Sequence, residues 1–278
     1  MVGFAFSPNL KANIYEALRM AHYFGGELVF VHVGRKTPEK ESIFNEIVGS
    51  SPVQSEKISV HWRIGDPVRT LLQASKDFGV DLILLGALKR ENVLKFYLGS
   101  IARKITRKAK CSVLLLINPS VERQPCQHIV VNGLDSPQTK LTIEAAFVVA
   151  NALGVKKISL IEEISRSKVA VAVDDDRSLR RATLKKEKLR RQEQTRVKDV
   201  VQRLSDVLTA DVNWTTQSIF GRRGYSIGHY AKLVRADLLV MNSQENLSFI
   251  DRFITRDIEH ILAELPTDVL IINLKGNE

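Results

Sequence analysis

The residues of this chain whose types and spacing best suit ligand chemistry lie between residues 84 and 104. An apolar run ends at Gly86, a polar stretch follows, and Gly99-Ser100 then opens a helix-forming segment. Glycine lets a backbone approach a ligand closely, and the first N–H groups of a helix lack partners within the helix. Together with the helix dipole, those groups attract an anion, and the Ser100 hydroxyl adds a donor. This stretch is therefore a candidate phosphate-binding loop.

Lys89 stands where a further glycine would suit such a loop. A lysine does not readily adopt the positive φ that glycine allows, so the loop can differ in shape from a glycine-rich one. Its ammonium group can, however, meet phosphate charge in place of backbone N–H groups. The alternative is that Gly99-Ser100 only caps the helix and that Lys89 is a solvated loop residue. The sequence leaves both interpretations open.

Other side chains with catalytic or metal-binding chemistry form no comparable group. The six histidines show no metal-ligand spacing, and Cys111 and Cys126 support neither a disulfide framework nor a zinc site. We find no pair of carboxylates at the end of a strand and no nucleophile beside a base. Three aspartates at 174–176 precede a basic segment and are interpreted as its helix cap. We therefore assign no catalytic residue and no metal ligand.

The elements that must position the loop follow from the apolar pattern. Short apolar runs alternate with helix-length segments, which is typical of parallel βαβ units, and strands rich in Val, Ile and Leu are expected to be covered on both faces. In the first half the expected strands are 2–6, 27–33, 58–64, 81–86 and 112–117, and the expected helices lie near 10–24, 38–48, 67–79 and 98–109. In the second half the expected strands are 128–133, 157–163, 212–219, 237–242 and 268–273.

The two halves are copies of one plan. Their ends align at an offset of 156 residues and their starts at an offset of 129, and the repeat rests on the order of elements more than on identical residues. A segment with a proline near each end separates them. We predict a first domain at 1–118, a linker at 119–127 and a second domain at 128–278.

Three motifs in this frame resemble the universal stress protein family. They are FSPN at 6–9, GDP at 65–67 and the run from 81 to 117. The resemblance implies an α/β chain of two tandem domains, each a five-stranded parallel sheet flanked by helices, packed as a pseudo-dimer. Domains of this family pair through their last strands, which here implies that 112–117 runs beside 268–273. Such pairing buries two sheet edges that would otherwise invite further strands.

Many members of the family bind ATP through Gly-x2-Gly-x9-Gly-Ser/Thr. The first domain reads Gly86-x2-Lys89-x9-Gly99-Ser100, so the resemblance makes ATP or AMP a candidate ligand there. We expect no required cofactor.

The end of the first strand departs from the pattern of the ATP-binding members. They usually carry an aspartate there, and here Ala5 offers no hydrogen-bonding side chain. Val33, the last residue of the second strand, completes the candidate site with Ala5. In the second domain Leu134 occupies the aspartate slot, and Asp135 follows one residue later, which turns its side chain to the other face.

The second domain has lost the loop. Asn242, Glu245, Thr255 and Arg256 stand at its four key places, and Glu245 would repel a phosphate. We expect no ATP binding of the family type in this domain. The segment at 220–228 contains three glycines, but their spacing fits neither a dinucleotide fingerprint nor a P-loop, and we interpret it as a glycine-rich turn.

The net charge of +10 is concentrated in one segment. Residues 177–203 hold eleven basic and three acidic residues, a local net charge of +8. We expect a long basic helix at about 177–208, because apolar residues recur three and four apart toward its end, up to Val207 and Leu208. Before Val197 they thin out, which predicts a solvated extension. The basic patch consists of Arg180, Arg181, Lys185, Lys186, Lys188, Arg190 and Arg191.

A solvated helix face is the simplest interpretation of this patch. Binding of nucleic acid, anionic lipid or an acidic partner at 177–203 is the alternative. No aromatic residues are interleaved with the charges, so base stacking is not expected.

No apolar run approaches the ~20 residues that cross a bilayer, and no signal peptide is recognisable, so we expect a cytoplasmic protein. The leading hypothesis is a non-catalytic stress-response or regulatory protein, with a homo-dimer open as an assembly. The alternative is a cytosolic regulatory domain of a membrane transporter or antiporter, because MVGFAF enters the first strand almost at once.

Overall fold

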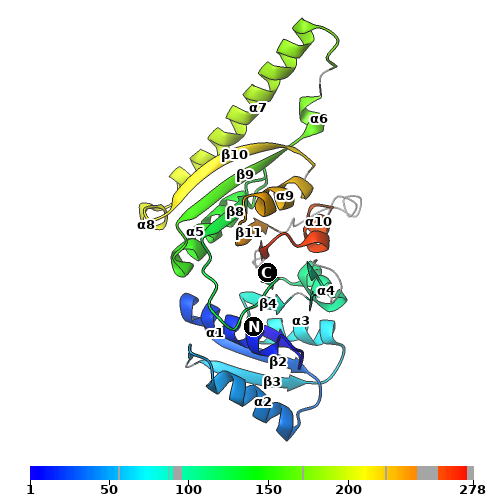
Figure 1. The fold of residues 1–278 in the computed structure, drawn as a ribbon, viewed down its shortest axis with the longest axis vertical. Helices are drawn as coiled ribbons and strands as arrows, with labels where there is room; N and C mark the ends of the chain where they lie inside the picture. The colour runs from blue at the N-terminus through cyan, green and yellow to red at the C-terminus, as the bar shows by residue number, and fades with distance from the viewer. Residues whose placement is uncertain are drawn as a thin grey trace. The chain divides into compact units, whose positions relative to one another are not determined.

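The computed structural model describes residues 1–55, 57–86, 88–89, 96–170, 172–222, 224–242 and 256–273. The chain divides into two compact units (Figure 1), Met1–Pro125 with Asp268–Glu278 and Cys126–Thr267. The boundary near residue 125 falls inside the linker expected at 119–127. The final strand is grouped with the first unit, although it belongs to the second half of the sequence.

The sheet of the first unit contains the five expected parallel strands and one antiparallel strand from the end of the chain. Its strands are β1 (Val2–Phe4), β2 (Leu28–Val33), β3 (Ile58–Arg63), β4 (Leu82–Gly86), β7 (Ser112–Leu116) and β12 (Asp268–Ile272). The order across the sheet is β12-β7-β4-β1-β2-β3, and all neighbours are parallel except β12 and β7. A separate antiparallel pair joins β5 (Leu88–Lys89) and β6 (Phe96–Tyr97).

Strand β12 is fixed to β7 at both ends as well as along the ladder. Leu270 lies opposite Leu114 in the antiparallel register. The N–H of Ile117 donates to Oδ1 of Asp268 at 2.8 Å, and the amide of Asn273 donates to the carbonyl oxygen of Cys111 at 2.9 Å. The edge that β7 would otherwise expose is therefore covered.

Four helices of the first unit flank its sheet in two packed pairs, α1 with α2 and α3 with α4. They are α1 (Leu10–Phe24), α2 (Pro38–Gly49), α3 (Pro67–Asp77) and α4 (Ser100–Lys108). The GDP motif sets the start of α3. Gly65 has φ +142°, which disfavours other residues, Asp66 accepts a hydrogen bond from the N–H of Arg69, and Pro67 suits the first helical position.

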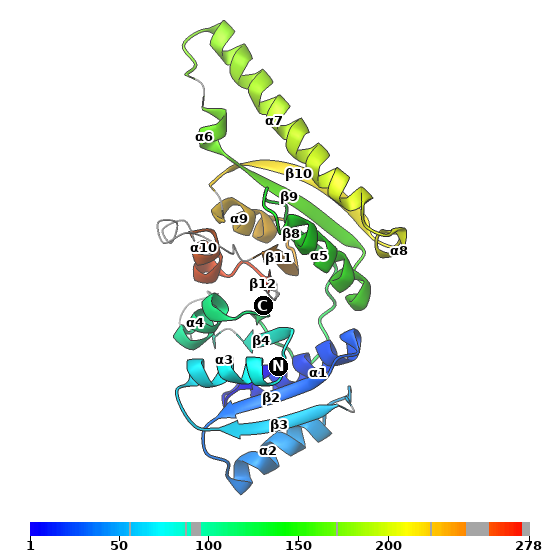
Figure 2. The same cartoon turned by 180° about the vertical axis from the view of Figure 1, so that it is seen from behind.

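The second unit repeats this arrangement with four parallel strands. They are β8 (His128–Asn132), β9 (Lys157–Ser165), β10 (Asn213–Gly221) and β11 (Leu238–Asn242), in the order β10-β9-β8-β11. Its helices are α5 (Thr139–Leu153), α6 (Arg166–Val169), α7 (Asp176–Gln202), α8 (Asp206–Thr209), α9 (Tyr225–Leu233) and α10 (Arg256–Glu264). Helix α5 packs against α7, and α9 packs against α10 (Figure 2).

The long basic helix begins where the sequence predicts but ends earlier. Asp175 caps α7 by accepting the N–H of Ser178, which confirms the interpretation of the aspartates. The helix stops at Gln202 rather than near residue 208, because Ser205 takes an extended conformation and starts the short α8. Val207 is consequently 85% exposed instead of lying on an apolar face.

The first half of α7 extends past the ends of the strands of its own unit (Figures 1 and 2), as the thinning of apolar residues predicts. Leu179 and Leu184 are exposed there, whereas Val197 and Val201 are buried against the domain. None of the helices among the described residues is both long enough and apolar enough to cross a membrane.

Candidate functional site

The strand order of the first unit creates a topological switch point, where open parallel sheets commonly bind ligands in a crevice. The chain proceeds from β1 to β2 and β3 on one side, whereas β4 and β7 lie on the other side. In open parallel sheets, ligands bind outside the carboxyl ends of the strands at such a switch point. Gly86 and Val33 end β4 and β2, and Ala5 directly follows β1, so three of the six predicted site residues share this edge.

Aromatic side chains line the carboxyl end of β1. Ala5 is exposed, and the ring of the following residue, Phe6, lies edge-on to His32 at 5.2 Å and stacks beside Trp62 at 6.2 Å. Nδ1 of His32 is 3.0 Å from the carbonyl oxygen of Phe4. The edge of β1 therefore presents aromatic surface and no carboxylate.

Gly86 is needed for packing within the unit. A Cβ atom at this position would lie 2.6 Å from Oδ1 of Asn13, a residue of α1. This Oδ1 atom is buried and has no hydrogen-bond partner among the described residues. A side chain at residue 86 would therefore displace the Asn13 amide, whatever binds in the crevice.

Helix α4 begins at Ser100 directly after Gly99, as predicted for the loop. Gly99 has φ −57° and ψ 156°, which any residue can adopt, so the backbone does not require glycine here. The helix has neither a side-chain cap nor an acidic residue in its first turn, and Ser100 is exposed. The backbone of Lys89 pairs with that of Phe96 in the β5–β6 ladder. The rest of the loop lies outside the described residues.

The corresponding crevice of the second unit, between β8 and β11, is bridged by its own side chains. The amide of Asn242 donates to Oγ of Ser136 and to Oε1 of Gln138, both at 3.0 Å. The Thr139 hydroxyl donates to the carbonyl oxygen of Leu134, the residue in the aspartate slot. Of the other positions named for this loop, Glu245 and Thr255 lie outside the described residues, and Arg256 begins α10.

The segment at 220–228 is a turn only in part, because Phe220 and Gly221 end β10 and residues 225–228 begin α9. Gly224 has φ +74° and precedes the helix. The carboxylate of Glu163 accepts the N–H of Gly224 and the N–H of Ile227, both at 2.7 Å. The anion-attracting N-terminus of α9 is thus occupied by a carboxylate of the same chain.

Two adjacent carboxylates are buried toward the end of β9, and they face opposite sides of the sheet. Glu162 and Glu163 are neighbours in β9, and only 2% and 7% of their surfaces are exposed. Successive side chains of a strand point to opposite faces, so Glu163 reaches α9 whereas Glu162 faces α7. Two adjacent acids inside the apolar run 157–163 were the signal in the sequence.

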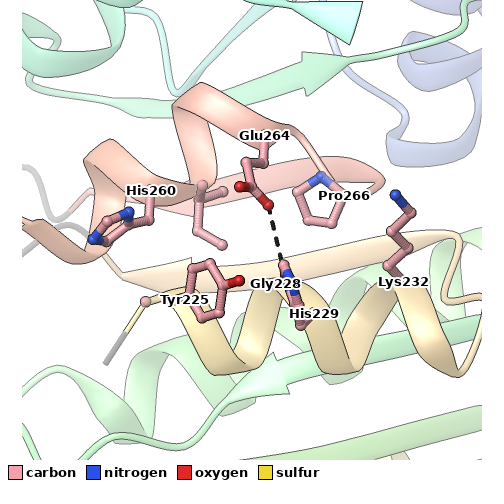
Figure 3. A pocket seen from close by; sticks show the side chains of 9 residues that line it. Tyr225, Gly228, His229, Lys232, His260, Glu264 and Pro266 are labelled. Atoms are coloured by element: carbon pink, nitrogen blue, oxygen red, sulfur yellow. Dashed lines mark ion pairs between the residues drawn. The ribbon is translucent and has the colours of Figure 1, made fainter. Parts of the chain in front are cut away.

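A small pocket lies between α9 and α10 (Figure 3). Tyr225 and His229 of α9 face His260 and Glu264 of α10, and Nδ1 of His229 is 3.7 Å from Oε2 of Glu264. Its volume of about 30 Å³ suits two or so water molecules and not a nucleotide. Within the described ranges, no group of three or more His, Cys, Asp or Glu could hold a metal ion.

All seven residues of the basic patch are exposed on α7. Arg190 and Arg191 each lie 3.3 Å from the carboxylate of Glu187, and the guanidinium of Arg190 is 5.6 Å from the centre of the Phe220 ring. Exposed pairs of this kind contribute little to stability. Because all seven side chains are exposed, most of the patch charge faces solvent.

Comparison with known proteins finds a family resemblance in the first half of the chain. Residues 51–116, which include the candidate loop, match the model of the universal stress protein family. The first unit therefore contains a segment that is similar to universal stress proteins. The curated Universal stress protein Sll1388 of Synechocystis sp. is 24% identical over 92 residues, which cover 32% of this chain and 58% of that protein. The matched region therefore spans somewhat over half the length of this curated relative.

Solved structures resemble the whole chain. A universal stress protein from Archaeoglobus fulgidus has a TM-score of 0.68 at 17% identity, and the match covers 99% of this chain and 98% of that one. The cytoplasmic domain of a prokaryotic cation chloride cotransporter has a TM-score of 0.51 at 14% identity, and the match covers 100% of this chain and 95% of that one. The chain therefore has the fold of two tandem universal-stress-protein-like α/β domains.

Proposed function

We propose that this chain is a non-catalytic cytoplasmic regulatory protein whose first domain binds a nucleotide or another phosphate-bearing anion. The observation that carries the proposal is the start of α4, where Gly99 and Ser100 lead into a helix without a side-chain cap or an acidic first turn. The N–H groups there are suited to phosphate oxygens. The family match includes this loop, which supports the proposal further.

The phosphate end of the ligand, rather than its nucleoside, supplies most of the binding in this proposal. Ala5 offers no acceptor for a ribose hydroxyl, and Phe6 packs on His32 beside it. We therefore expect ATP to bind more tightly than AMP. We assign no hydrolysis to the site, because no carboxylate base stands near the start of α4 in the sequence.

The second domain acts in this proposal as a structural partner without ATP. The bridge from Asn242 to Ser136 and Gln138 occupies its crevice. We infer that the two domains pair through β7 and β12, for which the hydrogen bonds of Asp268 and Asn273 provide support.

Calorimetric titration and melting curves with ATP, AMP and inorganic phosphate test the proposal. Ser100→Glu places a carboxylate in the anion site and should weaken ATP binding at least tenfold, while the helix tolerates an acid in its first turn. Gly99→Ala should also weaken ATP binding without unfolding the chain, because its backbone angles suit alanine. Ser205→Glu, before the similarly uncapped α8, is the matched control. If no nucleotide binds the wild type at millimolar concentration, the proposal fails.

A second candidate function is that of a cytosolic regulatory domain in a membrane transporter. The structural likeness to the cotransporter's cytoplasmic domain extends over the whole chain and favours it. The genomic reading frame around this sequence tests it. A frame encoding transmembrane helices joined to these residues would support this candidate, and a frame limited to them would overturn it.

A further inference from the structure

A cavity of about 140 Å³ lies in the second unit, apart from the loop of the proposed function. Asp135 after β8, Glu162 of β9, Lys168 of α6, and Glu193 and Arg196 of α7 contribute to its lining. One water molecule needs about 10–15 Å³ by the same measure, so the cavity accommodates a small organic molecule.

Glu162 is the unusual group in this cavity. Its side chain is 2% exposed, and Oε2 accepts a hydrogen bond from the Ser218 hydroxyl at 3.3 Å. Oε1 has no hydrogen-bond partner within the part of the chain that the structure describes. A buried acceptor that lacks a donor is costly, which indicates that something outside the chain can supply one.

Arg196 is the nearest cation and is already engaged elsewhere. Its Nη2 donates to the carbonyl oxygen of Gly133 at 2.5 Å, and its Nε donates to Glu193 at 3.0 Å. Nη2 lies 3.8 Å from Oε1 of Glu162, which is too far for a hydrogen bond. Arg196 therefore holds the wall of the cavity and forms a long ion pair with Oε1 of Glu162, but it donates no hydrogen bond to that atom.

The lining carries more acidic than basic side chains. The lining contains Asp135, Glu162, Glu163 and Glu193 together with Lys168 and Arg196, although the carboxylate of Glu163 is directed toward α9. Glu163 is satisfied by the N-terminus of α9, and Nε of Arg196 lies near both Glu193 and Asp135. Oε1 of Glu162 is then the acceptor of this lining that lacks a hydrogen bond, and a cation with several N–H donors can supply one.

We propose that this cavity binds a small organic cation, a guanidinium or amine compound, with Oε1 of Glu162 as its anchoring acceptor. The ligand's N–H groups would donate to Glu162, and a short alkyl part would fill the space toward Leu134. A neutral molecule of the same shape has no positive charge to interact with this acidic lining, so it should bind more weakly.

Protonation of Glu162 gives the binding a measurable signature. Burial raises the pKa of Glu162 to about 8, Glu193 and Asp135 raise it further, and Arg196 and the Ser218 hydroxyl lower it. The other charged residues that line the cavity around Glu162 are Glu163 and Lys168. Near pH 7 the carboxyl group is mostly protonated, and a bound cation favours the carboxylate. Binding should therefore release close to one proton.

Titration calorimetry of the full chain with n-butylguanidinium at pH 7, in phosphate and in Tris, tests the proposal. Because the buffer takes up the released proton, the binding enthalpies measured in the two buffers should differ by about the difference between the ionisation enthalpies of phosphate and Tris. The isosteric n-butylurea, which is neutral, should bind at least tenfold more weakly. Glu162→Gln should weaken the cation at least tenfold, and Glu187→Gln on the exposed face of α7 should leave it unchanged.

Three results would overturn the proposal. They are equal binding of the urea and the guanidinium, undiminished binding to Glu162→Gln, and no binding of n-butylguanidinium at millimolar concentration. The comparison of the two compounds and the two buffers uses the wild-type chain alone, so it decides the question even if the Gln variant does not fold. Loss of ATP binding in the first domain would not affect it.

Discussion

The carboxylate of Glu163 lies 2.7 Å from the backbone nitrogen of Gly224, across the turn that joins β10 to α9. The same carboxylate accepts the N–H of Ile227, so a side chain of β9 occupies the helix N-terminus that a free anion would otherwise take. The glycine-rich turn of the second domain is thus satisfied internally. Neither α9 nor α4 of the first domain has an acidic residue in its own first turn, so the carboxylate at α9 is supplied by another element.

Removal of the Glu163 carboxylate should destabilise the second unit and expose an anion site. We expect Glu163→Ala to lower the free energy of unfolding by about 1–3 kcal/mol, because buried N–H groups lose a charged acceptor. Inorganic sulfate should then raise the melting temperature of the variant more than that of the wild type. Equal sulfate effects on both proteins would contradict this account of the turn.

The buried carboxyl group of Glu162 should make stability depend on pH. Its pKa rises from 4.5 in the unfolded chain to about 8 in the folded one, so the folded state holds the extra proton between these values. Stability should therefore fall as pH rises from about 5 to 8, with the full penalty above pH 8. Glu162→Gln lacks this penalty and should gain on the order of 3 kcal/mol relative to wild type across that range. Urea unfolding at pH 5, 7 and 9 measures the gain.

The control for this experiment is Glu187, a half-exposed residue of α7 that does not line the cavity. Its replacement by Gln should give a curve of stability against pH that runs parallel to that of the wild type. A parallel curve for Glu162→Gln as well would show that the Glu162 carboxyl group titrates normally.

Lys89 decides how the first domain holds phosphate, if the proposed function is right. We expect Lys89→Gln to weaken ATP binding about tenfold, or about 1.4 kcal/mol, because the variant has no ammonium group to donate a charge-assisted hydrogen bond to phosphate. The affinity should also become less sensitive to salt. Calorimetry at two salt concentrations measures both effects. If Lys89→Gly binds ATP more tightly than the wild type does, the lysine instead obstructs the phosphate site.

The sequence predicts the strands and helix starts well because their causes are local. The ten expected strands are all present with ends within two residues, since uninterrupted Val, Ile and Leu runs mark strands covered on both faces. The pairs Thr37-Pro38 and Asp66-Pro67 locate the starts of α2 and α3, because cap and proline act on adjacent residues.

The side-chain contacts of the candidate sites depend on residues far apart and could not be predicted. Glu163 meets a helix that begins 61 residues later, and Asn242 meets Ser136, which lies 106 residues earlier. The opposite orientations of Glu162 and Glu163 follow from strand geometry, but their partners follow only from the topology. Apolar spacing also predicts too late an end for α7, because it continues past Ser205, where the helix is interrupted.

The basic patch should not contribute to the fold, and its binding of acidic polymers is the alternative to a solvated helix face. Its side chains project from the exposed part of α7, so replacing Lys185, Lys186 and Lys188 together by Glu should change the melting temperature little. If the patch binds phosphates, affinity for a 20-base-pair DNA duplex should fall strongly in this variant. The slope of log affinity against log salt should fall by about three, because each phosphate that a lysine neutralises adds about 0.9 to the slope.

Charge reversal at Lys11, Lys57 and Lys140, exposed lysines outside α7, is the matched control for total charge. Because these lysines lie on other elements, their replacement should reduce DNA affinity far less than the α7 variant does. Equal reductions in the two variants would mean that net charge, and not the patch, governs binding. Wild-type affinity that does not change with salt would exclude binding to phosphates altogether, because release of counterions accompanies every phosphate that the protein neutralises.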